Sequence, residues 1–180
     1  MKEIFDHQFG LMCKYHQIEF ANGYTPPAPG PVDLQSRAGQ DRLRQFAWWV
    51  VEECVEARSA DARDRPEELS DVLHFMTELC ILSDVKPPSL AEIDLMRSTM
   101  DPHPEHDLHD VVHFVGRAMN LLKAKPWKQS PKPTDPENYQ FFIKMAMRSL
   151  IGVIKNEGHC PEKLYFHKNE INHSRIQSGY

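Results

Sequence analysis

Two pairs of acidic residues on neighbouring helical segments constrain the fold of this chain more than any other feature. The segments run from Gln45 to Cys80 and are separated by the short charged break DARDR. The pairs share one spacing, Glu53-x-x-Glu56 and Glu68-x-x-Asp71. Residues three apart on a helix lie on one face, about one turn apart. Each pair therefore presents two carboxylates in one direction, an arrangement that suits a metal ion.

Apolar residues border both acidic pairs at helical spacing. In the first segment they are Phe46, Trp49, Val50, Cys54 and Ala57, and in the second Leu69, Val72, Leu73, Met76 and Leu79. Four carboxylates at the edge of a core would repel one another and protonate unless divalent cations held them ionised. Ligation by oxygen alone favours Mg²⁺, with Mn²⁺ as an alternative, over zinc or copper. A single acidic pair would be read as a solvated helix face, but two pairs with apolar edges favour the metal site.

The composition narrows the class of protein. A chain of 180 residues with 41% hydrophobic residues is long enough to bury a core, and we expect one domain over residues 1–180. The net charge of −5 argues against a broad surface for nucleic acid. The four cysteines form no C-x-x-C pair, and no apolar run approaches the roughly 18 residues of a membrane span. We expect a protein of the cytosol, or of a host cell's cytosol if a phage encodes it.

Helical periodicity continues along the rest of the chain. Apolar spacing predicts helices over residues 3–20, 107–124 and 138–157, with a last helix beginning near Pro161. Residues 21–33 carry four prolines and two glycines, which predict a loop. The segment 134–136 resembles a helix start, and Gly158 is well placed to end a helix. Without sustained period-two alternation, the fold class is all-α, an antiparallel helical bundle.

One helical stretch is repeated in degenerate form. LSDVLHF at residues 69–75 recurs as LHDVVHF at residues 108–114, and Glu68 and Asp71 are matched by Asp107 and Asp110. An internal duplication of a helical unit explains this echo, with the first copy keeping the full acidic set.

The C-terminal stretch KNEINHSRIQSGY carries a second candidate site. Lys168, Asn172 and Arg175 stand at i, i+4 and i+7, on one face of a helix. Two cations and an amide can hold a polyphosphate and a sugar, and Tyr180 can add a hydroxyl. Alone, the pattern is better explained by a solvated helix whose cations lie at the negative end of the helix dipole.

Together these motifs resemble the all-α nucleoside triphosphate pyrophosphatase superfamily (MazG-like), in particular its dimeric dUTPase and phage-type dCTP/dUTP pyrophosphatase branch. The resemblance rests on both acidic pairs and on the tail pattern K-N-x-x-N-x-x-R-x-x-x-G-Y. It implies cleavage of the α–β phosphoanhydride bond of a deoxynucleoside triphosphate, with dUTP expected first and dCTP second, in a homodimer. A purine or modified nucleotide is the alternative substrate.

The resemblance also implies roles for individual residues. Metal ligation falls to Glu53, Glu56, Glu68 and Asp71, and contact with phosphate and sugar to Lys168, Asn172, Arg175 and Tyr180. Glu56 is the expected general base. The family's Trp- and Lys-containing segment between the acidic helices is missing from DARDRP, and KAKPWKQ resembles a displaced version. There Trp127 is expected to stack on the base, with Lys125 or Lys128 near phosphate, although a Trp packed beneath a Pro-rich loop fits as well.

Other readings compete with this one. Asp71-x-x-His74 and Asp110-x-x-His113 resemble the carboxylate-x-x-His spacing of di-iron bundles, but that class leaves the C-terminal tail without a role. A zinc site at His106, His109 and His113 is a further hypothesis, although ten histidines make such clustering common by chance. A degenerate binding module without catalysis is disfavoured by the intact acids of the first copy.

Overall fold

The computed structural model describes residues 1–89, 107–124 and 132–179, and all regular secondary structure in these ranges is helical. The helices are α1 (Lys2–Ala21), α2 (Arg37–Ser59), α3 (Arg65–Leu82), α5 (Leu108–Leu121), α6 (Pro136–Asn156) and α7 (Pro161–Gln177). The all-α prediction is therefore confirmed. None of the helices in the described ranges combines the length and apolar character needed to cross a membrane.

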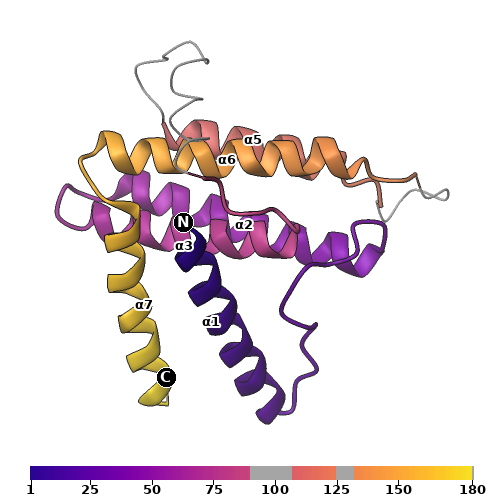
Figure 1. Ribbon diagram of the computed structural model, residues 1–180, viewed down its shortest axis with the longest axis horizontal. Helices are drawn as coiled ribbons and strands as arrows, with labels where there is room; N and C mark the ends of the chain where they lie inside the picture. Colours follow the sequence, from indigo (N-terminus) through magenta and orange to yellow (C-terminus); the bar gives the residue numbers. More distant parts are fainter. Residues whose placement is uncertain (90–106, 125–131, 180) are drawn as a thin grey trace.

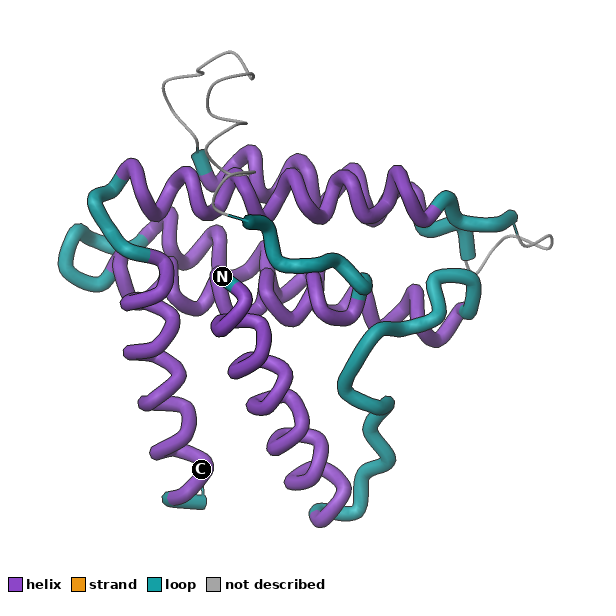
Figure 2. Tube along the Cα trace, viewed as in Figure 1, coloured by secondary structure: helices purple, strands orange, loops and turns teal. Residues whose placement is uncertain are grey.

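The helices form two stacked pairs with two further helices projecting from one of them. Helices α2 and α3 run side by side as a hairpin, and α5 and α6 make a second antiparallel pair packed on it (Figure 1). Helices α1 and α7 project from the α2–α3 layer on the side away from α5 and α6 (Figure 2). Both contact α3. One hydrophobic core contains side chains from all six of these helices.

Several helix ends follow signals that the sequence carries. The Asp135 carboxylate accepts hydrogen bonds from the backbone N–H groups of Glu137 and Asn138, with Pro136 in the first turn of α6. This N-cap arrangement satisfies donors that the first helical turn leaves unpaired. Gly158 follows α6 with φ of +83°, a conformation that glycine adopts without a steric penalty. The predicted start and end of this helix are confirmed.

Helix α2 begins earlier than the apolar periodicity suggests, at Arg37 rather than Gln45. Its N-cap is Ser36, whose hydroxyl accepts a hydrogen bond from Gly39 N at 3.0 Å. The chain turns so tightly there that a Cβ on Gly39 would lie 2.3 Å from the Asp33 carbonyl oxygen. A glycine inside a polar stretch lowers the helical expectation, which is why the periodicity alone misses this first part of α2.

The two copies of the repeat share core positions and differ at their histidines. Leu69 and Val72 of α3 are fully buried, as are Leu108 and Val111 of α5. His74 is buried, whereas His113 is exposed. The same apolar pattern therefore packs both helices into the core, but their polar faces meet different surroundings.

Candidate functional site

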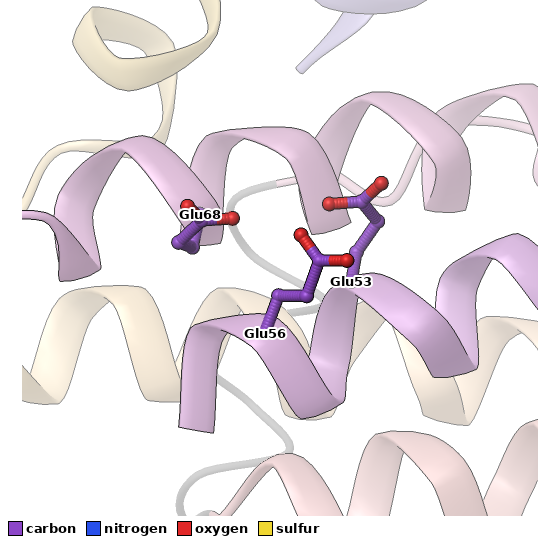
Figure 3. Close-up of side chains that lie close together, drawn as sticks. All are labelled: Glu53, Glu56 and Glu68. Carbon is purple, nitrogen blue, oxygen red and sulfur yellow. The ribbon is translucent and has the colours of Figure 1, made fainter. Parts of the chain in front are cut away.

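The acids of the two pairs lie on the seam between α2 and α3. The side chains of Glu53, Glu56 and Glu68 come from both helices and converge (Figure 3). Each offers a carboxylate oxygen, and these oxygens lie within 4.8 Å of one another. Among the described residues, this is the group of His, Cys, Asp and Glu side chains whose ligand atoms lie close enough together to hold one metal ion. Helical spacing within α2 and the packing of α2 against α3 thus bring three of the four predicted ligands together.

Burial and mutual repulsion raise the pKa values of acids on this seam. The pKa of Glu53 is raised to about 7, first by burial and then by the negative charges of Asp71, Glu56 and Glu68. The pKa of Glu68 is also raised, by burial and then by Asp71 and Glu56. Without a cation the cluster is therefore a region of uncompensated negative charge, which is the electrostatic condition that a divalent metal relieves.

The fourth acid, Asp71, is held by α7. Lys168 Nζ lies 2.7 Å from Asp71 Oδ2 and 2.9 Å from Glu67 Oε1. Burial lowers the pKa of Lys168, but its hydrogen bonds to Asp71 and Glu67 raise the pKa above its ordinary value, so the ammonium stays charged. Sequence reasoning placed Lys168 on the phosphates and did not single out Glu67, because spacing along α3 does not show which acid α7 will meet.

The remaining tail residues lie further along α7. Asn172, one turn beyond Lys168, is half-buried, and Arg175, a turn later, is exposed. Tyr180 lies outside the described residues. Lys168, which contacts the acids of α3, is thus the first residue of the predicted phosphate-binding face. The other residues of this face follow along the projecting end of α7 (Figure 1).

The base-stacking residue Trp127 also lies outside the described residues, together with Lys125 and Lys128. The described flanks of that segment are fixed at the N-terminal end of α2. Ala124 N donates to Gln40 Oε1 at 2.8 Å, and Gln40 Nε2 donates to Thr134 Oγ1 at 3.1 Å. Since a helix rises about 1.5 Å per residue, Gln40 and Glu53 are separated by roughly 20 Å along α2. The role of Trp127 stays a prediction.

An aromatic pair lies next to the acids, and the sequence analysis assigned one member, Trp49, only to the apolar border and gave the other, Phe75, no role. Trp49 precedes Glu53 by one turn, and Phe75 follows Asp71 by one turn. Their ring centroids are 5.5 Å apart across the α2–α3 seam, and both side chains are half-buried. The signal was available in the four-residue offsets from the acids, which place each ring on the same face as its acidic neighbour.

None of the histidines in the described ranges belongs to the acidic cluster. His74 is 5% exposed, stacks on Tyr165 with ring centroids 4.3 Å apart, and has its Nε2 3.3 Å from the Tyr165 carbonyl oxygen. Burial lowers the pKa of His74 to about 4, so the ring is neutral at physiological pH. His109 and His113 are exposed on α5, while His106 lies outside the described residues. The di-iron and zinc readings therefore gain no support from this geometry.

Comparison with known proteins supplies the family. A family model described as dUTPase matches residues 40–180, a range that includes the acidic quartet and the whole C-terminal motif. The chain belongs to this dUTPase family. No curated protein and no solved structure matches it. Family membership supports hydrolysis of a deoxynucleoside triphosphate of the dUTP kind, whereas the phage-type dCTP/dUTP branch stays a prediction. The dUTPase match leaves α1 outside.

Proposed function

We propose that the protein is a Mg²⁺-dependent pyrophosphohydrolase that converts dUTP to dUMP and pyrophosphate, with dCTP as the second candidate substrate. The observation that carries this proposal is the convergence of Glu53, Glu56 and Glu68 within 4.8 Å in a chain of the dUTPase family. Lys168 beside them supplies a cation for the phosphates. A triphosphate needs metals and cations placed together in this way, because its hydrolysis is catalysed mainly by positioning and charge stabilisation.

The donor set fits magnesium. All four proposed ligands, Glu53, Glu56, Glu68 and Asp71, offer carboxylate oxygens, which Mg²⁺ and Mn²⁺ prefer. The raised pKa of Glu53 fits a site that lacks its counter-charge. When bound, Mg²⁺ would neutralise the triphosphate and lower the pKa of a bound water.

The chain's own residues have distinct tasks in this proposal. Glu56, the exposed member of the converging acids, takes the proton of the attacking water as general base. The water oxygen forms a bond to the α phosphorus while the bond from this phosphorus to the bridging oxygen breaks, and pyrophosphate leaves with the electron pair of that bond. Lys168, Asn172 and Arg175 hold phosphate and sugar along α7, with Tyr180 beyond its end.

The base is recognised separately from the phosphates. The tail residues contact groups that every deoxynucleotide shares, whereas discrimination between bases needs polar groups directed at the base edge. We propose dUTP on the strength of the family, and a purine or modified nucleotide is the alternative. The test is to compare kcat/KM for dUTP, dCTP, dTTP, dATP and dGTP. A purine preferred over both dUTP and dCTP by more than about tenfold, roughly 1.4 kcal/mol, would contradict the assignment of the base.

The proposed working form is a homodimer. Large apolar side chains remain exposed on several of the described helices, including Trp48 and Val55 of α2, at 61% and 57%, Phe20 of α1, at 67%, and Phe141 of α6, at 50%. Helix α2 also carries two of the proposed metal ligands. A second copy packed on the exposed side of α2 would cover Trp48 and Val55 and place the subunit interface next to the site.

A further inference from the structure

Helix α7 is held on the bundle by apolar packing of Leu164, Tyr165 and Phe166 against the core and by several polar contacts. Its buried residues are Pro161, Tyr165, Lys168 and Asn169, and only the first of these is wholly apolar. The polar contacts fix its orientation, because hydrogen bonds and ion pairs are directional whereas apolar packing is not. At the N-terminal end of α7, the Met1 ammonium pairs with Glu162 and the Ser70 hydroxyl donates to the Leu164 carbonyl oxygen. Around Lys168 there are two further groups of contacts, ion pairs with acids of α3 and a hydrogen-bonded network further along α3.

The ionic contact is the pairing of Lys168 with Asp71 and Glu67. In the proposed reaction, both partners of this ion pair have another group to bind. Metal ions compete with the Lys168 ammonium for Asp71, and the triphosphate competes with Asp71 for the ammonium. The ion pair between Lys168 and Asp71 is therefore replaced by contacts to metal and phosphate when the metal–nucleotide complex binds. It cannot by itself keep α7 in place.

The hydrogen-bonded network passes through Gln8 of α1, which is fully buried. The Tyr165 hydroxyl donates to Gln8 Oε1 at 2.9 Å, and Gln8 Nε2 donates to Glu78 Oε1 at 2.6 Å. Asn169 Nδ2 donates to the Tyr165 hydroxyl at 3.2 Å. One amide thus connects α3 and α7, and both of its polar ends are satisfied. We call Gln8, Glu78, Tyr165 and Asn169 the Gln8 network.

The Gln8 network fixes the part of α7 that presents Lys168. Tyr165 lies just under one turn before Lys168, and Asn169 directly follows it. The stacking of Tyr165 on His74 holds the same segment against α3. None of the hydrogen bonds of the network uses a group that the metal or the triphosphate would claim.

We propose that Gln8 is a positioning residue for the nucleotide site: it keeps α7 docked while Lys168 exchanges Asp71 for phosphate. The inference rests on the proposed function, and it assigns a role to a helix outside the family match. Gln8 acts through Tyr165 and Asn169 and does not contact the reacting groups.

Four variants test this role. Gln8→Leu removes both hydrogen bonds, and Tyr165→Phe removes only the hydroxyl while keeping the ring that stacks on His74. The exchange variant Gln8→Glu/Glu78→Gln keeps the bond that Tyr165 donates and restores the bond between positions 8 and 78 with donor and acceptor reversed. The new carboxylate at position 8 accepts from the amide at position 78 and from Tyr165. Gln17→Leu is the matched control, since Gln17 is exposed on the same helix.

The first measurement is amide hydrogen exchange without metal or nucleotide. In Gln8→Leu and Tyr165→Phe, exchange over residues 165–172 is expected to accelerate by about tenfold or more, with residues 143–151 of α6 unchanged. The exchange variant should return to within about threefold of wild type. Exchange in Gln8→Leu and Tyr165→Phe that matches the Gln17→Leu control would overturn the proposal. If Gln8→Leu does not fold, Tyr165→Phe and the exchange variant decide alone.

The second measurement is steady-state kinetics with dUTP at saturating Mg²⁺. The expected result is a KM raised by about tenfold in Gln8→Leu and Tyr165→Phe, a kcat within about threefold of wild type, and recovery in the exchange variant. Accelerated exchange with an unchanged KM would show that the network is only structural and would overturn the positioning role. If wild type hydrolyses no deoxynucleotide, the proposed function fails, and hydrogen exchange still tests whether Gln8 anchors α7.

Discussion

Lys168 Nζ lies 2.7 Å from Asp71 Oδ2, so the cation expected to bind phosphate is paired with an acid expected to bind metal. Only 7% of the Lys168 side chain is exposed, and the contact is therefore well shielded from solvent. This pairing joins the two candidate sites of the sequence, the acidic hairpin and the C-terminal tail, into one.

Replacing Lys168 is expected to affect metal and nucleotide in opposite directions. Lys168→Met removes a charge-assisted hydrogen bond to phosphate, about 1.5–3 kcal/mol, so KM for dUTP should rise about tenfold to a hundredfold. The same change frees Asp71, so Mn²⁺ should bind more tightly in the absence of nucleotide. Titration calorimetry and steady-state kinetics measure the two effects. Lys163→Met is the control, because Lys163 is exposed on the same helix.

Weaker Mn²⁺ binding in Lys168→Met would contradict this account, since it would mean that the ammonium supports the metal site rather than competing with it. An unchanged KM would remove Lys168 from the phosphate site.

Stability without metal should depend on the ionisation of Glu53. Its pKa is about 7 in the folded chain and near 4.3 in an unfolded one, so the folded state binds more protons between these values. Linkage then requires that Glu53 contributes most stability below its unfolded pKa and loses it as pH rises through about 7. In chelator, chemical denaturation should show a smaller loss of stability between pH 5 and 8 for Glu53→Gln than for wild type.

Glu78 also has a pKa of about 7 in the folded chain, raised by burial. It contributes equally to the pH dependence of stability in wild type and in Glu53→Gln. The difference between them therefore isolates Glu53. Identical pH dependence in wild type and Glu53→Gln would show that burial and the neighbouring acids do not raise the pKa of Glu53 in the folded chain.

Two glycines should respond oppositely to the same substitution. Gly39→Ala places a methyl group 2.3 Å from the Asp33 carbonyl oxygen, so the start of α2 must shift, at a cost of about 1–3 kcal/mol. Gly10 lies in α1, where an added methyl group would meet no other atom within 4 Å, and Gly10→Ala should stabilise by about 0.5–1 kcal/mol. Urea denaturation of both variants measures the difference. A Gly39→Ala variant as stable as wild type would contradict the close contact at this turn.

The sequence predicts the helices well and the convergence of acids in part. Local signals such as the Asp135 cap and Gly158 determine the ends of α6. The three-residue offset places Glu53 and Glu56 on one face of α2, and the short connection to α3 forms a hairpin that brings Glu68 to them. These features depend on geometry within one helix or between helices adjacent in the sequence.

Features that depend on contacts between distant helices could not be read in this way. The pairing of Lys168 with Asp71 joins residues 97 apart, and Gln8 meets Tyr165 across 157 residues. Gln8 stands in an amphipathic helix where a glutamine is ordinarily solvated, so no local pattern indicates its burial. The apolar periodicity does not indicate the early start of α2 for a different reason: the first turns of this helix are polar and contain Gly39.

The homodimer is testable by mass in solution. Light scattering at micromolar concentration should give twice the mass of the chain, and Trp48→Glu should shift the equilibrium toward monomer, because it places a charge on an apolar surface of α2. Glu170→Lys on α7, which is exposed, controls for a general effect of changing surface charge. A wild-type protein that stays monomeric at these concentrations would contradict the dimer.

The most direct test of the central claim is the identity of the products. Wild-type protein incubated with dUTP should release dUMP and pyrophosphate in equal amounts with Mg²⁺ and neither product in chelator. Glu53→Gln, Glu56→Gln, Glu68→Gln and Asp71→Asn should each lose at least about a hundredfold of that activity while remaining folded by circular dichroism. Release of orthophosphate alone, no turnover of any deoxynucleotide, or full activity in both Glu56→Gln and Asp71→Asn would contradict the account.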